Sequence, residues 1–182
     1  MADTRSKASQ RLVIDASVAQ SAGDLSAQHP VSTRCRDFLK AVLEICHHLV
    51  MTPEIDEEWK KHASRFARTW RVEMFVKEKV DWARVFPQTE LRAKVCDETA
   101  EDQRCIMLKD WHLIEAAMAT DRIIVSRDDT VRGLFSGASK TVGEIRKVIW
   151  VNPVEELDPC SWLEKGASAE DRRMLGKAGE ST

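Results

Sequence analysis

The sequence predicts an α/β fold in which a parallel β-sheet carries helices on both faces. Short apolar runs, rich in β-branched residues, have the length and composition of buried strands; they lie at 11–15, 49–51, 123–126 and 148–151. The segments between them repeat apolar residues at helical spacing. Strands that alternate with helices pair in parallel, because each helical crossover returns the chain to the same edge of the sheet.

The length of 182 residues allows one domain with one core. We expect a flexible N-terminus at 1–10, a folded domain at 11–163, and a disordered charged tail at 164–182, which is rich in glycine, alanine and charge. The polar N-terminus lacks the apolar stretch of a signal peptide, and no run is long enough to span a membrane. These features predict a cytoplasmic protein with no membrane contact.

Charge and cysteine content exclude two classes of protein. Lys and Arg total 28 against 30 Asp and Glu, so binding to a polyanion would need local clusters of basic residues. The five cysteines contain no Cys-x-x-Cys pair, which argues against a disulfide framework or a zinc knuckle.

The helices are predicted from spacing and from start signals. A helix follows the first strand at about 33–49, and Thr52 with Pro53 begins a long one that extends to about residue 80. A charged, peripheral helix is expected at 90–104. Asp110 begins another helix, and the shorter ones at 130–135 and 141–147 follow the third strand.

The long helix has two distinct faces. Its apolar stripe includes Trp59 and Trp70, which we interpret as core residues rather than as platforms for bases. The opposite face carries a basic stripe composed of Lys61, Arg65, Arg68 and Arg71. A solvated helix face is the commoner explanation of such a stripe, and a phosphate-binding surface is the alternative. Arg127 adjoins the acid Asp128 and has the same two explanations.

Four acids are predicted to meet at one edge of the sheet. Asp15 and Asp128 lie at or just past the ends of two strands, Asp110 begins a helix, and Glu58 lies early in the helix that follows another strand. Functional groups of such folds gather at the carboxyl ends of the strands. Taken singly, each acid is better explained as a turn residue, a helix cap or a surface acid than as a ligand. Together they suggest a cation site, because clustered carboxylates repel one another.

The chemistry of such a cluster follows from its oxygen ligands. Oxygen-only ligation favours Mg²⁺ or Mn²⁺. These ions activate a water molecule and neutralise the charge that develops on a phosphodiester during its hydrolysis. The cluster therefore predicts metal-dependent hydrolysis of a phosphate ester.

The motifs VIDASV, TPEIDEEW, KDWHLIEAA and IIVSRDD, in this order across 11–153, resemble those of PIN-domain nucleases. The resemblance implies a flavodoxin-like three-layer sandwich and an acidic pocket that binds Mg²⁺ or Mn²⁺. It also implies cleavage of RNA. Many relatives are VapC-type toxins that are inhibited by an antitoxin, and many form homodimers. This chain departs from the compact toxins in the long helical segment between Glu58 and Asp110 and in its charged tail.

Some assignments within the site stay open at the level of sequence. We choose Glu58 as the second acid, with Glu57 in reserve, because Glu58 borders the apolar stripe. Ser17 and Ser126 each have two equally good explanations. They are either turn or capping residues, or they donate hydrogen bonds that orient the carboxylates.

Other residues and folds give weaker signals. The histidines match no zinc spacing and are expected at the surface or in an interface. A non-catalytic module that binds RNA or a protein partner on the same fold is the main alternative function. A phosphatase of the haloacid-dehalogenase type is disfavoured, because Asp15 lacks a second aspartate two residues later.

Overall fold

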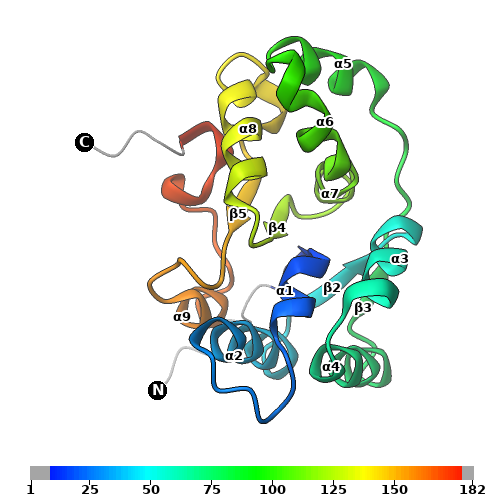
Figure 1. Ribbon diagram of the computed structural model, residues 1–182, viewed down its shortest axis with the longest axis vertical. Helices are drawn as coiled ribbons and strands as arrows, with labels where there is room; N and C mark the ends of the chain where they lie inside the picture. Colours follow the sequence, from blue (N-terminus) through cyan, green and yellow to red (C-terminus); the bar gives the residue numbers. More distant parts are fainter. Residues whose placement is uncertain (1–8, 178–182) are drawn as a thin grey trace, which may run out of the picture.

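The computed structural model describes residues 9–177 (Figure 1). These residues form a five-stranded, all-parallel sheet in the order β3-β2-β1-β4-β5, which confirms the predicted α/β class and its three-layer, flavodoxin-like architecture. The strands are β1 (Arg11–Ile14), β2 (His48–Met51), β3 (Val80–Trp82), β4 (Ile123–Val125) and β5 (Ile149–Val151).

Helices cover both faces of the sheet (Figure 1). One side carries α2 (Pro30–Glu44), α4 (Arg65–Val76) and α9 (Pro159–Glu164). The other side carries α5 (Thr89–Asp97), α6 (Glu101–Lys109), α7 (Trp111–Met118) and α8 (Asp129–Ser139). Two further helices follow β1 and β2 directly and pack against each other, α1 (Ala16–Ser21) and α3 (Pro53–His62).

The sheet reverses its direction of growth between β1 and β4. From β1 the chain builds outward through β2 to β3, then crosses back to add β4 and β5 on the other side. Ile14 pairs with Val125, and the backbone amide of Asp15 donates to the Val125 carbonyl at 2.9 Å. Right-handed crossovers send the connections after β1 and β4 to opposite faces, and the carboxyl ends of two such strands are where open α/β sheets generally bind ligands.

Two tryptophans anchor α3 and α4 in the core. Trp59 and Trp70 are 0% and 2% exposed, and their rings stack with centroids 5.9 Å apart. The indole nitrogen of Trp59 donates to the Ile14 carbonyl at 2.8 Å. This bond ties α3 to the end of β1, next to Asp15, and both residues have the packing role predicted for them.

The prediction of one long helix at 53–80 is wrong. The chain breaks at Ala63, whose ψ is 132°, and the Ser64 hydroxyl then accepts the amide of Ala67 at 3.2 Å to cap α4. Glu78, with φ of 56°, turns the chain into β3, which the sequence did not predict. The helix predicted at 90–104 is likewise two helices, α5 and α6.

The prediction of a disordered tail is wrong for residues 165–177. Arg173 and Leu175 are each 1% exposed, and Met174 forms an antiparallel bridge with Ile149 at the outer edge of β5. Arg173 pairs with Glu156 at 3.0 Å and stacks over Trp162 at 5.0 Å. These contacts outweigh the polar composition that suggested disorder.

The flexible N-terminus predicted at 1–10 falls mostly on residues 1–8, and these lie outside the described residues, as do 178–182. Within the described range, none of the helices combines the length and the apolar character needed to cross a membrane.

Candidate functional site

Asp15 is held at the carboxyl end of β1 by two hydroxyl groups. Its side chain is buried, and its Oδ2 accepts hydrogen bonds from Ser17 Oγ at 2.5 Å and from Ser126 Oγ at 2.8 Å. Both serines therefore orient the Asp15 carboxylate, which is one of the two roles that the sequence allowed for them. Because both bonds fall on Oδ2, Oδ1 is left without a hydrogen-bond donor from the described residues.

The same hydroxyls position the loop that follows β4. Ser126 Oγ accepts the amide of Asp128 at 3.1 Å, and Ser17 Oγ accepts the amide of Arg127 at 3.1 Å. Asp128 then caps α8, since its Oδ1 accepts the amide of Val131 at 2.8 Å. The loop is thus fastened to the end of β1, and Asp128 is both a helix cap and a neighbour of Asp15.

Asp110 lies between α6 and α7 and has a different environment. Its side chain makes no capping bond, and neither of its oxygens accepts a hydrogen bond from the residues that the structure describes. Burial raises the pKa of this carboxyl to about 6, and the negative charges of Asp15, Asp128 and Glu58 contribute to the same shift. Asp15, Asp128 and Glu58 therefore lie close enough to Asp110 to influence its pKa.

Glu58 faces the site from α3, whereas Glu57 faces solvent. Glu58 Oε2 lies 3.4 Å from His112 Nε2, and this contact with His112 lowers the pKa of Glu58. The side chain of Glu57 is 71% exposed and lies 3.9 Å from Lys61. Of the two alternatives left open by the sequence, the structure places Glu58 beside the other acids.

His112, which was predicted as a surface or interface residue, lies half-buried beside Glu58. Its side chain is 15% exposed, and Nδ1 lies 3.0 Å from the carbonyl oxygen of Lys109. Burial tends to lower the pKa of His112, but the bond and the charge of Glu58 outweigh it and raise the pKa. The sequence signal was its position two residues after Asp110, on the first turn of α7.

The four acids share one edge without forming a closed coordination sphere. Between residues 9 and 177, no group of three or more histidine, cysteine or acidic side chains is arranged to hold a metal ion. Each of the four acids has an oxygen that no described donor occupies, and carboxylate oxygens are the type of ligand that hard divalent cations prefer. The pKa of Asp110 is raised first by burial, and the negative charges of the neighbouring acids add to that shift.

The predicted basic stripe is divided between two helices. Lys61 lies on α3, and Arg65, Arg68 and Arg71 lie on α4. Arg71 forms an ion pair with Asp56 and stacks over a phenylalanine, so its guanidinium holds α3 against α4. The remaining three side chains are exposed to solvent.

Two polar residues near the site had been missed or left ambiguous. Asp56 is only 8% exposed and also pairs with Lys60 at 2.6 Å; its position three residues before Trp59, on the apolar stripe, was the available signal. Arg127 donates from one terminal nitrogen to the Ser21 hydroxyl, whereas its Nε is buried without a partner among the described residues.

No protein-family model, curated protein or solved structure matches this chain. What the site can do is therefore inferred from its own residues.

Proposed function

We propose that this protein is a metal-dependent endoribonuclease, in which Asp15, Glu58, Asp110 and Asp128 hold Mg²⁺ or Mn²⁺. The observation that carries the proposal is the link between Asp15 and Asp128 at the carboxyl ends of β1 and β4. Ser126 donates to Asp15 and accepts the amide of Asp128, and Ser17 joins Asp15 to the amide of Arg127. Ligands of parallel α/β sheets bind at this point of the topology.

The electrostatics support the same proposal. Acids that weaken the metal-free fold by mutual repulsion are explained if they serve a ligand. Among the causes that shift the pKa of Asp110, the positive charge of His112 is the one that offsets the other acids. No lysine or arginine of the described chain forms an ion pair with Asp15, Asp110 or Asp128.

The side chains have separate roles in the proposed reaction. When bound, the metal would supply an activated water and neutralise charge on the phosphodiester. Ser17 and Ser126 keep Asp15 in one orientation, and the α8 cap does the same for Asp128. His112 restrains Glu58 through their ion pair. Preorganised ligands of this kind reduce the rearrangement needed during reaction.

The RNA backbone would be bound by cations beside the acids. Lys61 lies close enough to Glu58 to influence its pKa, and it is exposed. Arg65 and Arg68 extend the exposed positive charge along α4. Contacts of this kind would make binding depend on salt but not on sequence.

A non-catalytic RNA-binding module is the second candidate. It is favoured by one observation, namely that the carboxylates are not drawn together into a metal site within residues 9–177. Such a module would bind RNA and leave it intact, with or without metal.

One experiment separates the two candidates. A mixed RNA pool is incubated with the purified protein, with and without manganese, and the new RNA ends are mapped. The same assay is applied to Asp110→Asn and to the control Asp97→Asn, which changes an exposed acid on α5. We expect manganese-dependent cuts from the wild type and the control only. Equal cleavage by Asp110→Asn would contradict the metal site, and intact RNA in every sample would favour the binding module.

A further inference from the structure

A hollow opens beside His112, the residue that contacts Glu58. It has a volume of about 240 Å³, and its apolar walls come from Pro53 at the start of α3 and from Ala83, Val85 and Pro87 in the loop after β3. The volume corresponds to about eight water molecules. It is smaller than the roughly 300 Å³ at which pockets for drug-sized ligands begin, so the space suits one planar ring system.

The polar groups of this hollow are predominantly hydrogen-bond acceptors. Glu54 and Glu115 contribute carboxylates to its lining. Glu115 Oε1 accepts the amide of Gln88 at 2.8 Å, which fixes the carboxylate, and Oε2 accepts no hydrogen bond from any described residue. A phosphate group would be repelled here, whereas a ligand with N–H donors would be accepted.

His112 connects the hollow to the candidate site. Its ring is part of the lining, and its Nε2 faces Glu58 at 3.4 Å. A nucleotide whose phosphate lies at the acids can therefore extend its base toward the hollow.

We propose that this hollow is a subsite for a nucleobase that carries an exocyclic amino group, adjacent to the cleaved bond. The proposal rests on the nuclease function and specifies its substrate. The proline rings and Val85 offer apolar surfaces to the faces of a base, and the carboxylates accept hydrogen bonds from an amino group of cytosine, adenine or guanine. Uracil has a carbonyl oxygen where cytosine has its amino group, so it loses this donor, keeps only its N3–H, and would bring that oxygen close to a carboxylate.

The first test uses the sequences around the cuts. RNA ends produced in manganese are mapped for the wild type, for Ala83→Leu, which fills the hollow, and for Glu115→Gln, whose amide still accepts the Gln88 amide but also donates. Ala93→Leu and Glu90→Gln, at exposed positions on α5, are the matched controls. We expect uracil to be depleted about tenfold at one position beside the cut. The depletion should persist in both controls and disappear from the cuts that Ala83→Leu and Glu115→Gln still make.

A second test does not depend on cleavage. Cytidine and uridine are titrated into the full-length, metal-free protein and followed by amide chemical shifts. Cytidine should shift the resonances of Ala83, Val85 and Glu115, uridine should not, and Ala83→Leu should lose the response. Equal behaviour of the two nucleosides with the wild type would overturn the subsite, whether or not RNA is cut. Absence of cleavage together with a cytidine-specific response would instead refute the nuclease and retain the base site.

Discussion

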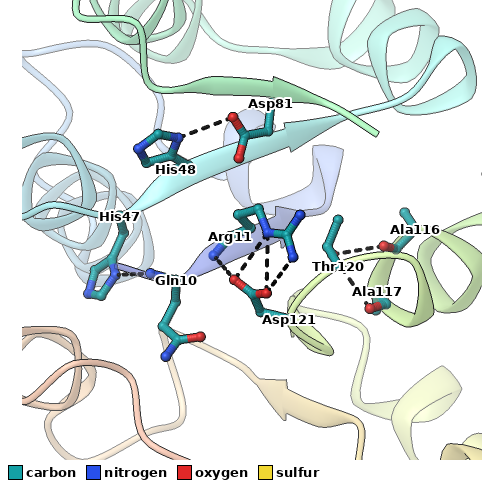
Figure 2. Close-up of polar contacts among 9 residues, drawn as sticks. All are labelled: Gln10, Arg11, His47, His48, Asp81, Ala116, Ala117, Thr120 and Asp121. Atoms are coloured by element: carbon teal, nitrogen blue, oxygen red, sulfur yellow. Dashed lines mark hydrogen bonds and ion pairs between the residues drawn. The ribbon is translucent and has the colours of Figure 1, made fainter. Parts of the chain in front are cut away.

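Carboxylates at the two ends of the sheet have opposite environments: those at the amino end have cationic partners, and Asp110 at the carboxyl end has acidic neighbours. At the amino end, Asp121 accepts the backbone amide of Arg11 at 2.7 Å and its guanidinium at 2.7 Å, and His48 lies 3.2 Å from Asp81 (Figure 2). The hydrogen bond with Arg11 lowers the pKa of Asp121. At the carboxyl end, burial and three neighbouring acids raise the pKa of Asp110 to about 6.

The same contrast holds for the neutral groups at the amino end. His47 is fully buried, which corrects its prediction as a surface or interface histidine. Its Nδ1 accepts the amide of Gln10 at 3.2 Å, and its Nε2 lies 2.8 Å from the carbonyl of Leu163 and therefore carries the proton (Figure 2 shows the former contact). The side chains of Asp121, His48 and His47 at the amino end thus all make polar contacts within the chain. Those at the carboxyl end have unused hydrogen-bonding capacity, which is characteristic of functional sites.

The largest expected effect separates two adjacent glutamates. Glu58→Gln should reduce manganese-dependent RNA cleavage about 100-fold, a magnitude typical of the loss of one preorganised charged group. Glu57→Gln should reduce it less than threefold, because its side chain is 71% exposed. Initial rates on one defined RNA measure both. Equal losses of activity in the two variants would show that cleavage depends on the total charge of α3 and not on Glu58 as a site residue.

The next effect is on stability and has opposite signs at the two ends. In the metal-free protein, Asp121→Asn should lower the free energy of unfolding by about 1–2 kcal/mol, since it removes a charged partner of Arg11. Asp110→Asn should raise it by about 1 kcal/mol, after allowance for the partial exposure of the group. Urea unfolding measures both variants. Destabilisation by both would remove the distinction between structural and functional acids.

The pH dependence of stability should show the same opposition. The pKa of Asp110 is higher in the folded state than in the unfolded state, so between these two values the folded protein binds a proton that the unfolded chain does not. The contribution of Asp110 to the free energy of unfolding therefore rises as the pH falls from about 7 to 5. The pKa of Asp121 is depressed, so its contribution is present above its unfolded pKa and is lost as the pH falls through its lower folded value. Urea unfolding of metal-free wild type and Asp110→Asn at pH 7 and pH 5 isolates the first effect. A pH response that is identical in both proteins would contradict it.

The smallest effect concerns the divided basic stripe. Charge reversal at Lys61 or Arg68 should weaken RNA binding and reduce the slope of log K against log salt by about one for each phosphate that is no longer neutralised. Arg71→Ala should leave the slope unchanged and destabilise the fold, because Asp56 is then buried without its arginine partner. Binding titrations at several salt concentrations measure the slopes. Unchanged slopes for Lys61 and Arg68 would identify their side chains as solvated only.

The contrast also shows what a sequence can and cannot predict. The buried strands and Asp15 and Asp128 beyond them were predictable, because an apolar run followed by an acid is a local signal. β3 was not, since Val80–Trp82 is short and has a charged centre. The break at Ser64 was hidden because the apolar stripe continues through it.

Long-range contacts account for the other failures. Arg173 is buried because it pairs with Glu156 and packs over Trp162. No local sequence pattern in the tail indicates that these residues are its partners. The hollow beside His112 is built by the loop at 83–87, which has no periodicity. Features that depend on side chains distant in sequence have no signature in a single chain.

Metal binding followed by thermal unfolding tests the central claim, that the acids of the carboxyl end form one metal site. The proteins are the wild type, Asp128→Asn and, from the amino end, Asp121→Asn; asparagine is also a good helix cap, so α8 should survive the change at 128. Manganese at about 100 times its dissociation constant stabilises a folded protein by about 2.7 kcal/mol. We expect a shift in Tm of roughly 5–10 °C for the wild type and for Asp121→Asn, and a much smaller shift for Asp128→Asn. Equal shifts in all three proteins, or none in the wild type, would contradict the site.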